Sequence, residues 1–127
     1  MIGNRFVTAI NCIDGRVQLP IIEWLKREYS VDYVNLVTEP GPDELLARGE
    51  DKAALDSIRQ RVELSIIRRN AEIIAVSGHH DCAANPVDED THIEQIRAAV
   101  EFIKTWHLMR DVIGLWVDKN WRVHRVI

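Results

Sequence analysis

The sequence of 127 residues predicts an α/β fold with three layers, a mainly parallel four-stranded sheet in the order 2-1-3-4, and a C-terminal antiparallel edge strand. Apolar runs of strand length alternate with segments of helical hydrophobic spacing, which is typical of strands joined by crossover helices. Residues 72–77 are too apolar for a strand with one wet face, as expected where helices cover both faces of a parallel sheet. At this length we expect a single domain over residues 1–127.

The first strand is predicted at residues 5–11, which are rich in strand-forming residues and lead into a polar loop at residues 12–16. A helix of about ten residues is predicted from Pro20, because proline is accepted in the first turn of a helix. Apolar and polar residues alternate over residues 31–37 and predict a second strand. Two prolines and a glycine within residues 38–43 end that strand.

The middle of the chain is predicted to be helical up to the third strand. Residues 43–52 are charged and predict a helical turn. An apolar stripe then predicts a longer helix that ends at about Asn70, with its charged residues on the solvated face. The third strand follows at residues 72–77 and leads directly into a polar turn that ends at Cys82.

The last part of the chain is predicted to hold one helix and two strands. Thr91 and Glu94 have the spacing of a capping box, which predicts the start of a helix that extends to about Trp106. Residues 111–117 predict the fourth strand. Residues 121–126 alternate in polarity after a turn, and we expect them to form the antiparallel edge strand.

The composition argues against several classes of function. The 20 acidic and 16 basic residues are interspersed and give a net charge of −4, so we expect no nucleic-acid or anionic-membrane partner. No apolar run approaches the roughly 18–20 residues of a membrane span, and the N-terminal residues do not have the pattern of a secretory signal. We therefore expect a cytoplasmic protein.

Two cysteines and one histidine lie where the predicted sheet would bring them together. Cys12 follows the first strand, whereas His79 and Cys82 follow the third. In a 2-1-3-4 sheet the strand order reverses between these two strands, and ligands bind at that point. Thiolate and imidazole are preferred zinc donors, and three protein ligands leave one position open, as in catalytic sites. The sequence therefore predicts a Zn²⁺ site, in preference to a disulfide or to two buried free cysteines.

The residues around these ligands form two short motifs. Cys12, Asp14 and Arg16 make a Cys-x-Asp-x-Arg motif, and His79 and Cys82 make a His-x-x-Cys motif. Occurring in this order, after two predicted strands, the motifs resemble those of the β-class carbonic anhydrases. Most of the chain takes part in the resemblance, which implies the fold of that family for the predicted three-layer sheet.

The resemblance implies a zinc lyase that reversibly hydrates carbon dioxide to bicarbonate by zinc-bound hydroxide, with Cys12, His79 and Cys82 as metal ligands. It also implies that Asp14 accepts a hydrogen bond from the hydroxide and that Arg16 keeps Asp14 ionised. In some members of the family the aspartate instead ligates zinc, so both roles remain open for Asp14. The family further implies a homodimer.

Two other functions remain open from the sequence. One is a non-catalytic zinc-binding protein of the same fold. The other is a carbonyl sulfide or carbon disulfide hydrolase, because relatives of this fold carry out those reactions. A cysteine-nucleophile phosphatase is disfavoured, because the segment from Cys12 to Arg16 has too few backbone amides to cradle a phosphate.

Several polar residues beside the motifs have more than one possible role. His80 adjoins His79 and is an alternative metal ligand, although the resemblance favours His79 and leaves His80 at the pocket rim. Asp81 is predicted either to orient a ligand or to cap a helix. Structural or solvated roles are expected for the other three histidines, which are His92, His107 and His124.

Overall fold

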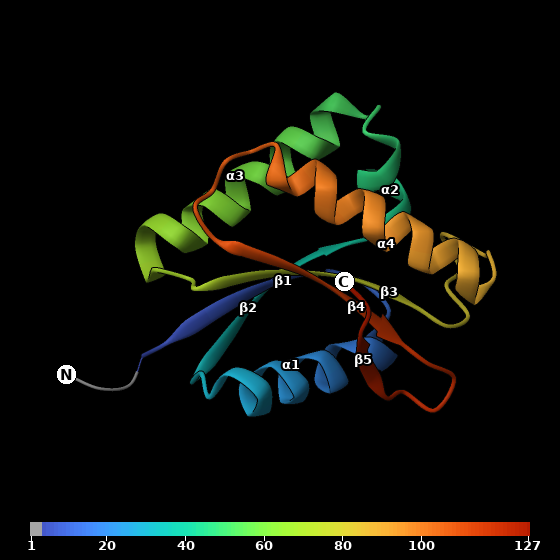
Figure 1. Ribbon diagram of the computed structural model, residues 1–127, viewed down its shortest axis with the longest axis horizontal. Coiled ribbons are helices and arrows are strands. Elements are labelled where there is room, and N and C mark those ends of the chain that lie inside the picture. Colours follow the sequence, from blue (N-terminus) through green and yellow to red (C-terminus); the bar gives the residue numbers. More distant parts are fainter. Residues whose placement is uncertain (1–3) are drawn as a thin grey trace.

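The computed structural model describes residues 4–127, in which strands and helices alternate along the chain (Figure 1). The elements in order are β1 (Phe6–Cys12), α1 (Gly15–Tyr29), β2 (Tyr33–Glu39), α2 (Pro42–Arg48), α3 (Lys52–Arg69), β3 (Ile73–His79), α4 (Glu89–Lys104), β4 (Asp111–Val117) and β5 (Val123–Arg125). Among the described residues, no helix is both long enough and apolar enough to cross a membrane.

The strands form one sheet in the order β2-β1-β3-β4-β5. β1 pairs in parallel with both β2 and β3, β3 pairs in parallel with β4, and β5 pairs antiparallel with β4. The predicted order and the antiparallel edge strand are therefore confirmed. Because β1 and β3 are neighbours, their carboxyl ends meet at one edge of the sheet, where the strand order reverses.

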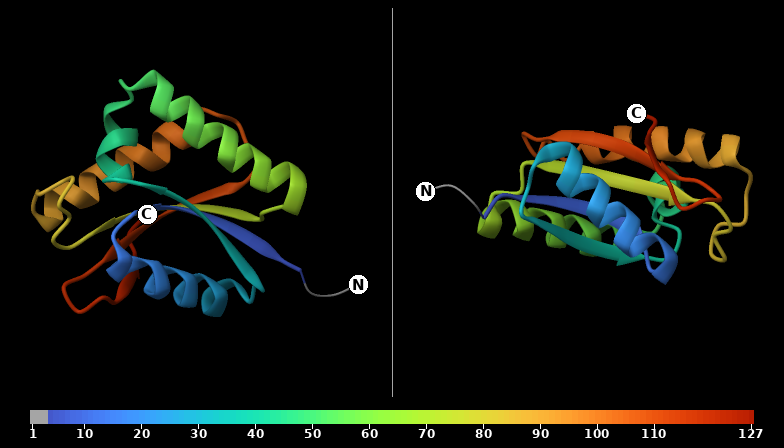
Figure 2. Two further views of the ribbon diagram at one scale, coloured as in Figure 1. Left: turned by 180° about the vertical axis from the view of Figure 1, so that it is seen from behind. Right: turned by 90° about the horizontal axis from the view of Figure 1, so that it is seen from below.

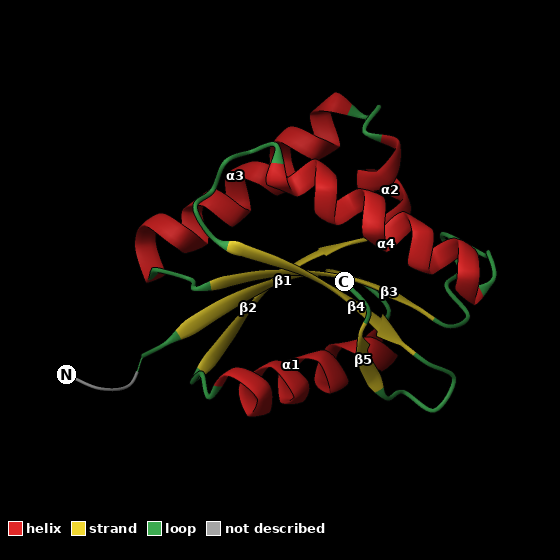
Figure 3. Ribbon diagram, in the orientation of Figure 1, coloured by secondary structure: helices red, strands yellow, loops and turns green. Residues whose placement is uncertain are grey.

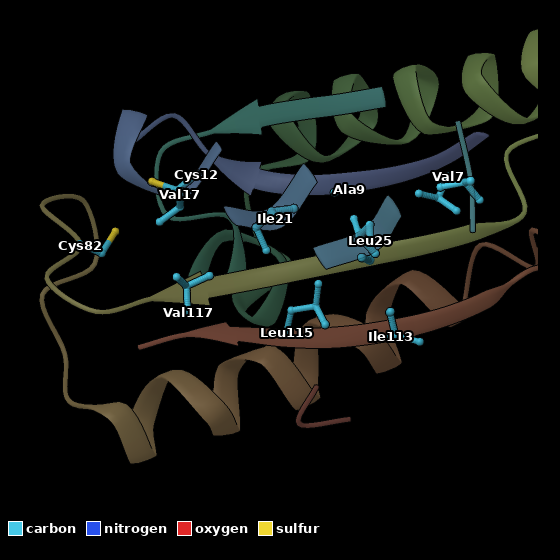
Figure 4. Packing of buried hydrophobic residues seen from close by; sticks show 12 residues of the cluster. Val7, Ala9, Cys12, Val17, Ile21, Leu25, Cys82, Ile113, Leu115 and Val117 are labelled. Carbon is cyan, nitrogen blue, oxygen red and sulfur yellow. The ribbon is translucent and has the colours of Figure 1, made fainter. Parts of the chain in front are cut away.

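Helices cover both faces of the sheet, which gives three layers (Figure 3). Helix α1 lies on one face, and α2, α3 and α4 lie on the other. On the α1 side, Ile21 and Leu25 pack against strand residues such as Ala9 and Leu115 (Figure 4). The opposite core includes Ile58, Ile74, Val76 and Val100. Residues 74–76 are completely buried, as the sequence predicts for a strand covered on both faces.

Helix α1 begins earlier than predicted. It starts at Gly15 rather than at Pro20, because the Asp14 side chain accepts the backbone N–H of Arg16 and caps the helix. Pro20 therefore lies inside the helix, where it cannot supply the N–H for one backbone hydrogen bond. The expected polar loop is thus short, and Arg16 belongs to the first helical turn.

Helix α4 also begins before its predicted start, so the proposed capping box was wrong. The N-cap is Asp88, whose carboxylate accepts the backbone N–H of Thr91 at 2.8 Å. Thr91 itself lies within the helix, and Glu89 and Asp90 occupy the first turn, where acidic residues favour the helix dipole.

The turn between β4 and β5 returns the chain toward α1. Asp118 accepts the backbone N–H groups of Asn120 and Arg122, and Trp121 has a φ of 60°. These features leave β5 shorter than the predicted 121–126 strand. Figure 2 shows this C-terminal hairpin beside the start of α1, so Trp121 approaches the segment that follows Cys12.

Candidate metal centre

Cys12, His79 and Cys82 come together at the carboxyl edge of the sheet. Cys12 ends β1, His79 ends β3, and Cys82 lies in the loop that follows β3. All three are buried, and their ligand atoms lie within 4.8 Å of one another. Figure 4 shows the side chains of Cys12 and Cys82 at the same end of the sheet. This group could therefore hold a metal ion, and its residues are the three that the sequence singles out.

The ring of His79 is oriented for metal binding. Its Nδ1 lies 2.8 Å from the carbonyl oxygen of His80, to which the Nδ1–H donates. The other ring nitrogen, Nε2, is buried and has no hydrogen-bond partner among the described residues. A buried polar atom without a partner is costly, and a bound metal ion would satisfy it. His80 supplies its backbone carbonyl, while its own side chain is exposed.

The two thiols differ in acidity. Burial raises the pKa of the Cys12 thiol, but the neighbouring His79 ring and the backbone N–H groups of Gly41 and Asp14 outweigh burial and lower this pKa. Burial together with the neighbouring Cys12 raises the pKa of Cys82. Two adjacent thiolates repel each other, and a divalent cation between them would stabilise both. The arrangement therefore suits a cation better than a pair of free thiols.

Asp14 and Arg16 form a two-pronged ion pair beside the cysteines. Arg16 Nη2 donates to Asp14 Oδ2 at 2.7 Å, and Arg16 Nε donates to Asp14 Oδ1 at 3.0 Å. These bonds hold the pKa of Asp14 at about 2, below its usual value of 3.8. Asp14 is half-buried and remains a carboxylate at neutral pH.

Arg16 also joins the two halves of the site. Its Nη1 donates to the carboxylate of Asp81 at 3.1 Å, and its Nη2 donates to the Asp81 carbonyl oxygen at 3.0 Å. The guanidinium lies 4.6 Å from the centre of the Trp121 ring, in a cation–π contact. Asp81 therefore orients Arg16, and it does not cap a helix, since Asp88 caps α4. No local pattern in the sequence predicts Trp121 at this position.

A cavity of about 700 Å³ opens beside Cys82. Its lining includes Asp81, Asp88, Glu89 and Asp118 but only one lysine, Lys119, so acidic residues outnumber basic ones. The exposed His80 and the indole of Trp116 also contribute to its lining. A small neutral molecule would meet less repulsion in such a cavity than an anion would.

The remaining histidines occupy three different environments. His107 is exposed, and His124 Nε2 lies 2.7 Å from the Asp118 carboxylate on the surface. His92 is fully buried and pairs with Asp43. No local motif links these two residues, because 49 positions separate them in the chain.

Comparison with known proteins gives consistent results. A family model described as "Putative carbonic anhydrase" matches residues 2–127. A search of curated proteins gave no match. The fold is similar to that of β-carbonic anhydrase isoform I from Trichomonas vaginalis, with a TM-score of 0.65 and 13% identity over 98% of this chain and 84% of that one. The carbonic anhydrase from Glaciozyma antarctica gives a TM-score of 0.60 and 14% identity over 98% and 83% of the two chains. At these identities the likeness shows the fold alone.

Proposed function

Because the chain belongs to the putative carbonic anhydrase family, we propose that it is a zinc-dependent enzyme that reversibly hydrates carbon dioxide to bicarbonate. The observation that carries this proposal is the buried Cys12–His79–Cys82 group beside the Asp14–Arg16 ion pair. The group offers metal ligands, and the ion pair offers a fixed carboxylate next to them.

The donor set favours zinc over other metals. Two thiolates and one imidazole are typical zinc ligands, and three protein ligands are typical of a catalytic site with one open position. The unpartnered Nε2 of His79 supports this fit. When bound, zinc would supply a water molecule whose pKa is lowered to about 7, and hence hydroxide near neutral pH.

Asp14 is proposed to orient the nucleophile. Its carboxylate stays ionised because Arg16 lowers its pKa, so it can accept a hydrogen bond throughout the neutral range. Both of its oxygens receive hydrogen bonds from Arg16. Asp14 also lies outside the group of described residues that could hold a metal. We therefore favour the orienting role over direct ligation of zinc by Asp14.

Arg16 is proposed as the positioning residue for Asp14. The contacts of Arg16 with Asp81 and Trp121 restrict its guanidinium from two further directions. A fixed guanidinium in turn fixes the carboxylate that it binds. The dyad thereby depends on both loops of the site and on the C-terminal hairpin.

Stopped-flow hydration of carbon dioxide tests the proposed activity. The zinc-loaded protein should accelerate hydration above the buffer rate, and Cys82→Ser should abolish the acceleration together with zinc binding. Hydrolysis of carbonyl sulfide without hydration of carbon dioxide would instead indicate a carbonyl sulfide hydrolase. Bound zinc with neither activity would leave a zinc-binding protein of this fold.

The assembly and the location stay predictions. Ile13 and Leu19 lie near the start of α1 and are each 60% exposed. A second copy of the chain that covered these side chains would remove apolar surface from water. We therefore retain the homodimer as a proposal, and the cytoplasmic location as an expectation from the sequence.

A further inference from the structure

We propose that Asp43, His92 and Asn85 form a buried polar brace that positions the backbone segments around Cys12 and Cys82 and thereby sets the zinc affinity of the site. This inference rests on the proposed zinc centre. It assigns a role to three residues that contribute no ligand atom to that centre. They act through α2, α4 and the loop after Cys82, which carry them.

The brace is a chain of hydrogen bonds within the protein interior. Asp43 and His92 are each 1% exposed, and Asn85 is 4% exposed. His92 Nδ1 lies 2.6 Å from Asp43 Oδ2, and Asn85 Nδ2 donates to Asp43 Oδ1 at 3.2 Å. Asn85 Nδ2 also lies 2.7 Å from Gln95 Oε1. The Asp43 carboxylate therefore connects α2 to α4 and to the loop after Cys82.

The brace joins the segments beside both cysteines. Asn85 lies in the loop that carries Cys82. Asp43 lies in the first turn of α2, which follows β2, and Glu39 at the end of β2 pairs with Cys12. The hydrogen bond from Asn85 to Asp43 thus connects the loop of Cys82 to the strand end beside Cys12.

Glycines allow the segments to approach this closely. Gly41 has a φ of 55°, in the left-handed region that favours glycine, and a Cβ there would lie 3.2 Å from the Asn85 Cβ. A Cβ at Gly78 would overlap the carboxylate of Asp43. Gly78 directly precedes His79, so the brace also packs against the strand end that carries the third ligand.

Stability alone does not account for a polar cluster at this place. Burying a carboxylate carries a desolvation cost that apolar side chains of similar volume would avoid. His92 packs its ring against Trp116, with centroids 5.1 Å apart, but its Nε2 has no partner among the described residues. Hydrogen bonds have preferred directions, whereas apolar contacts have none. The brace therefore fixes the position of the loop more precisely than apolar packing would.

The test compares zinc dissociation constants measured by competition with a chromophoric chelator on folded protein. His92→Leu and Asn85→Ala should each weaken zinc binding by about 10- to 100-fold, the range typical when the outer hydrogen bonds of a metal site are lost. His92→Gln keeps an N–H that can reach Asp43, and it should bind zinc more tightly than His92→Leu does. The ligands themselves stay unchanged in all three variants.

Ser65→Ala is the matched control for lost stability. Ser65 is a buried residue of α3 whose hydroxyl bonds Thr8 and the Val62 carbonyl, away from the brace. Its variant should lose thermal stability while keeping the zinc affinity of the parent. If His92→Leu does not fold, Asn85→Ala and His92→Gln carry the comparison.

The outcomes separate the brace from the zinc centre. Equal zinc affinity in the parent, Asn85→Ala and His92→Gln, together with any folded His92→Leu protein, would overturn the brace and leave the proposed function intact. A loss of affinity in Ser65→Ala equal to that in Asn85→Ala would also overturn it, because affinity would then follow stability alone. A parent protein that binds no zinc would overturn both proposals.

Discussion

Single residues at the site divide into those that offer ligand atoms and those that orient them. Cys12, His79 and Cys82 present their ligand atoms to one another in the interior. Asp14 is not part of this group, and Arg16 holds its carboxylate in an ion pair. We therefore expect substitutions in these two classes to differ in their effects on zinc binding and on turnover.

Replacing Asp14 with asparagine should reduce turnover while zinc stays bound. Asparagine cannot accept hydrogen bonds on both sides as the carboxylate does, so the nucleophile would lose its orientation. We expect a loss of about tenfold or more in hydration rate, the scale typical of a lost partner of a metal centre. Metal analysis and stopped-flow assays of the same sample measure both effects.

Glu28→Gln is the control for this charge change, because Glu28 lies on the exposed surface of the same helix. It should leave the hydration rate unchanged. An Asp14→Asn protein as fast as the parent would contradict the orienting role. The pKa of Asp14 is about 2, so its carboxylate loses its charge only as the pH falls toward that value. A loss of activity between about pH 5 and 8 would therefore have to come from another group.

Among the elements, the strands were easier to predict from the sequence than the helix starts. Strand interiors such as residues 73–76 are apolar over several positions, so their pattern is strong. Helix starts depend on which polar side chain reaches a free backbone N–H, and several candidates compete within a few positions. Asp14 and Asp88 cap α1 and α4, whereas Pro20 and Thr91 are interior.

A substitution at the start of α4 distinguishes the two possible caps. Asp88→Ala should lower the free energy of unfolding by about 0.5–2 kcal/mol, because it removes the acceptor for the Thr91 N–H. Thr91→Ala should cost less, since its hydroxyl is not at the N-cap. Urea unfolding of the two variants measures the difference, and a larger loss in Thr91→Ala would support the capping box instead.

At the scale of the whole molecule, the order of strands and helices along the chain predicted where the metal ligands meet. Cys12 and Cys82 are seventy positions apart, yet the alternation of strands and helices predicts that β1 and β3 lie side by side. The general rules of α/β folds were therefore enough to predict that the ligands meet at one edge of the sheet.

Contacts made by side chains between distant elements could not be predicted in this way. The pairing of Asp43 with His92 and the approach of Trp121 to Arg16 depend on how helices and the terminal hairpin pack. Neither contact leaves a periodic or local pattern in the sequence. The polar brace and the outer contacts of Arg16 are consequently visible only in the folded chain.

The zinc content of the purified protein, determined together with its free thiols, tests the proposed metal centre directly. We expect about one zinc ion per chain, with Cys12 and Cys82 protected from thiol reagents until a chelator removes the metal. A protein that folds with both thiols intact but takes up no zinc would contradict this expectation.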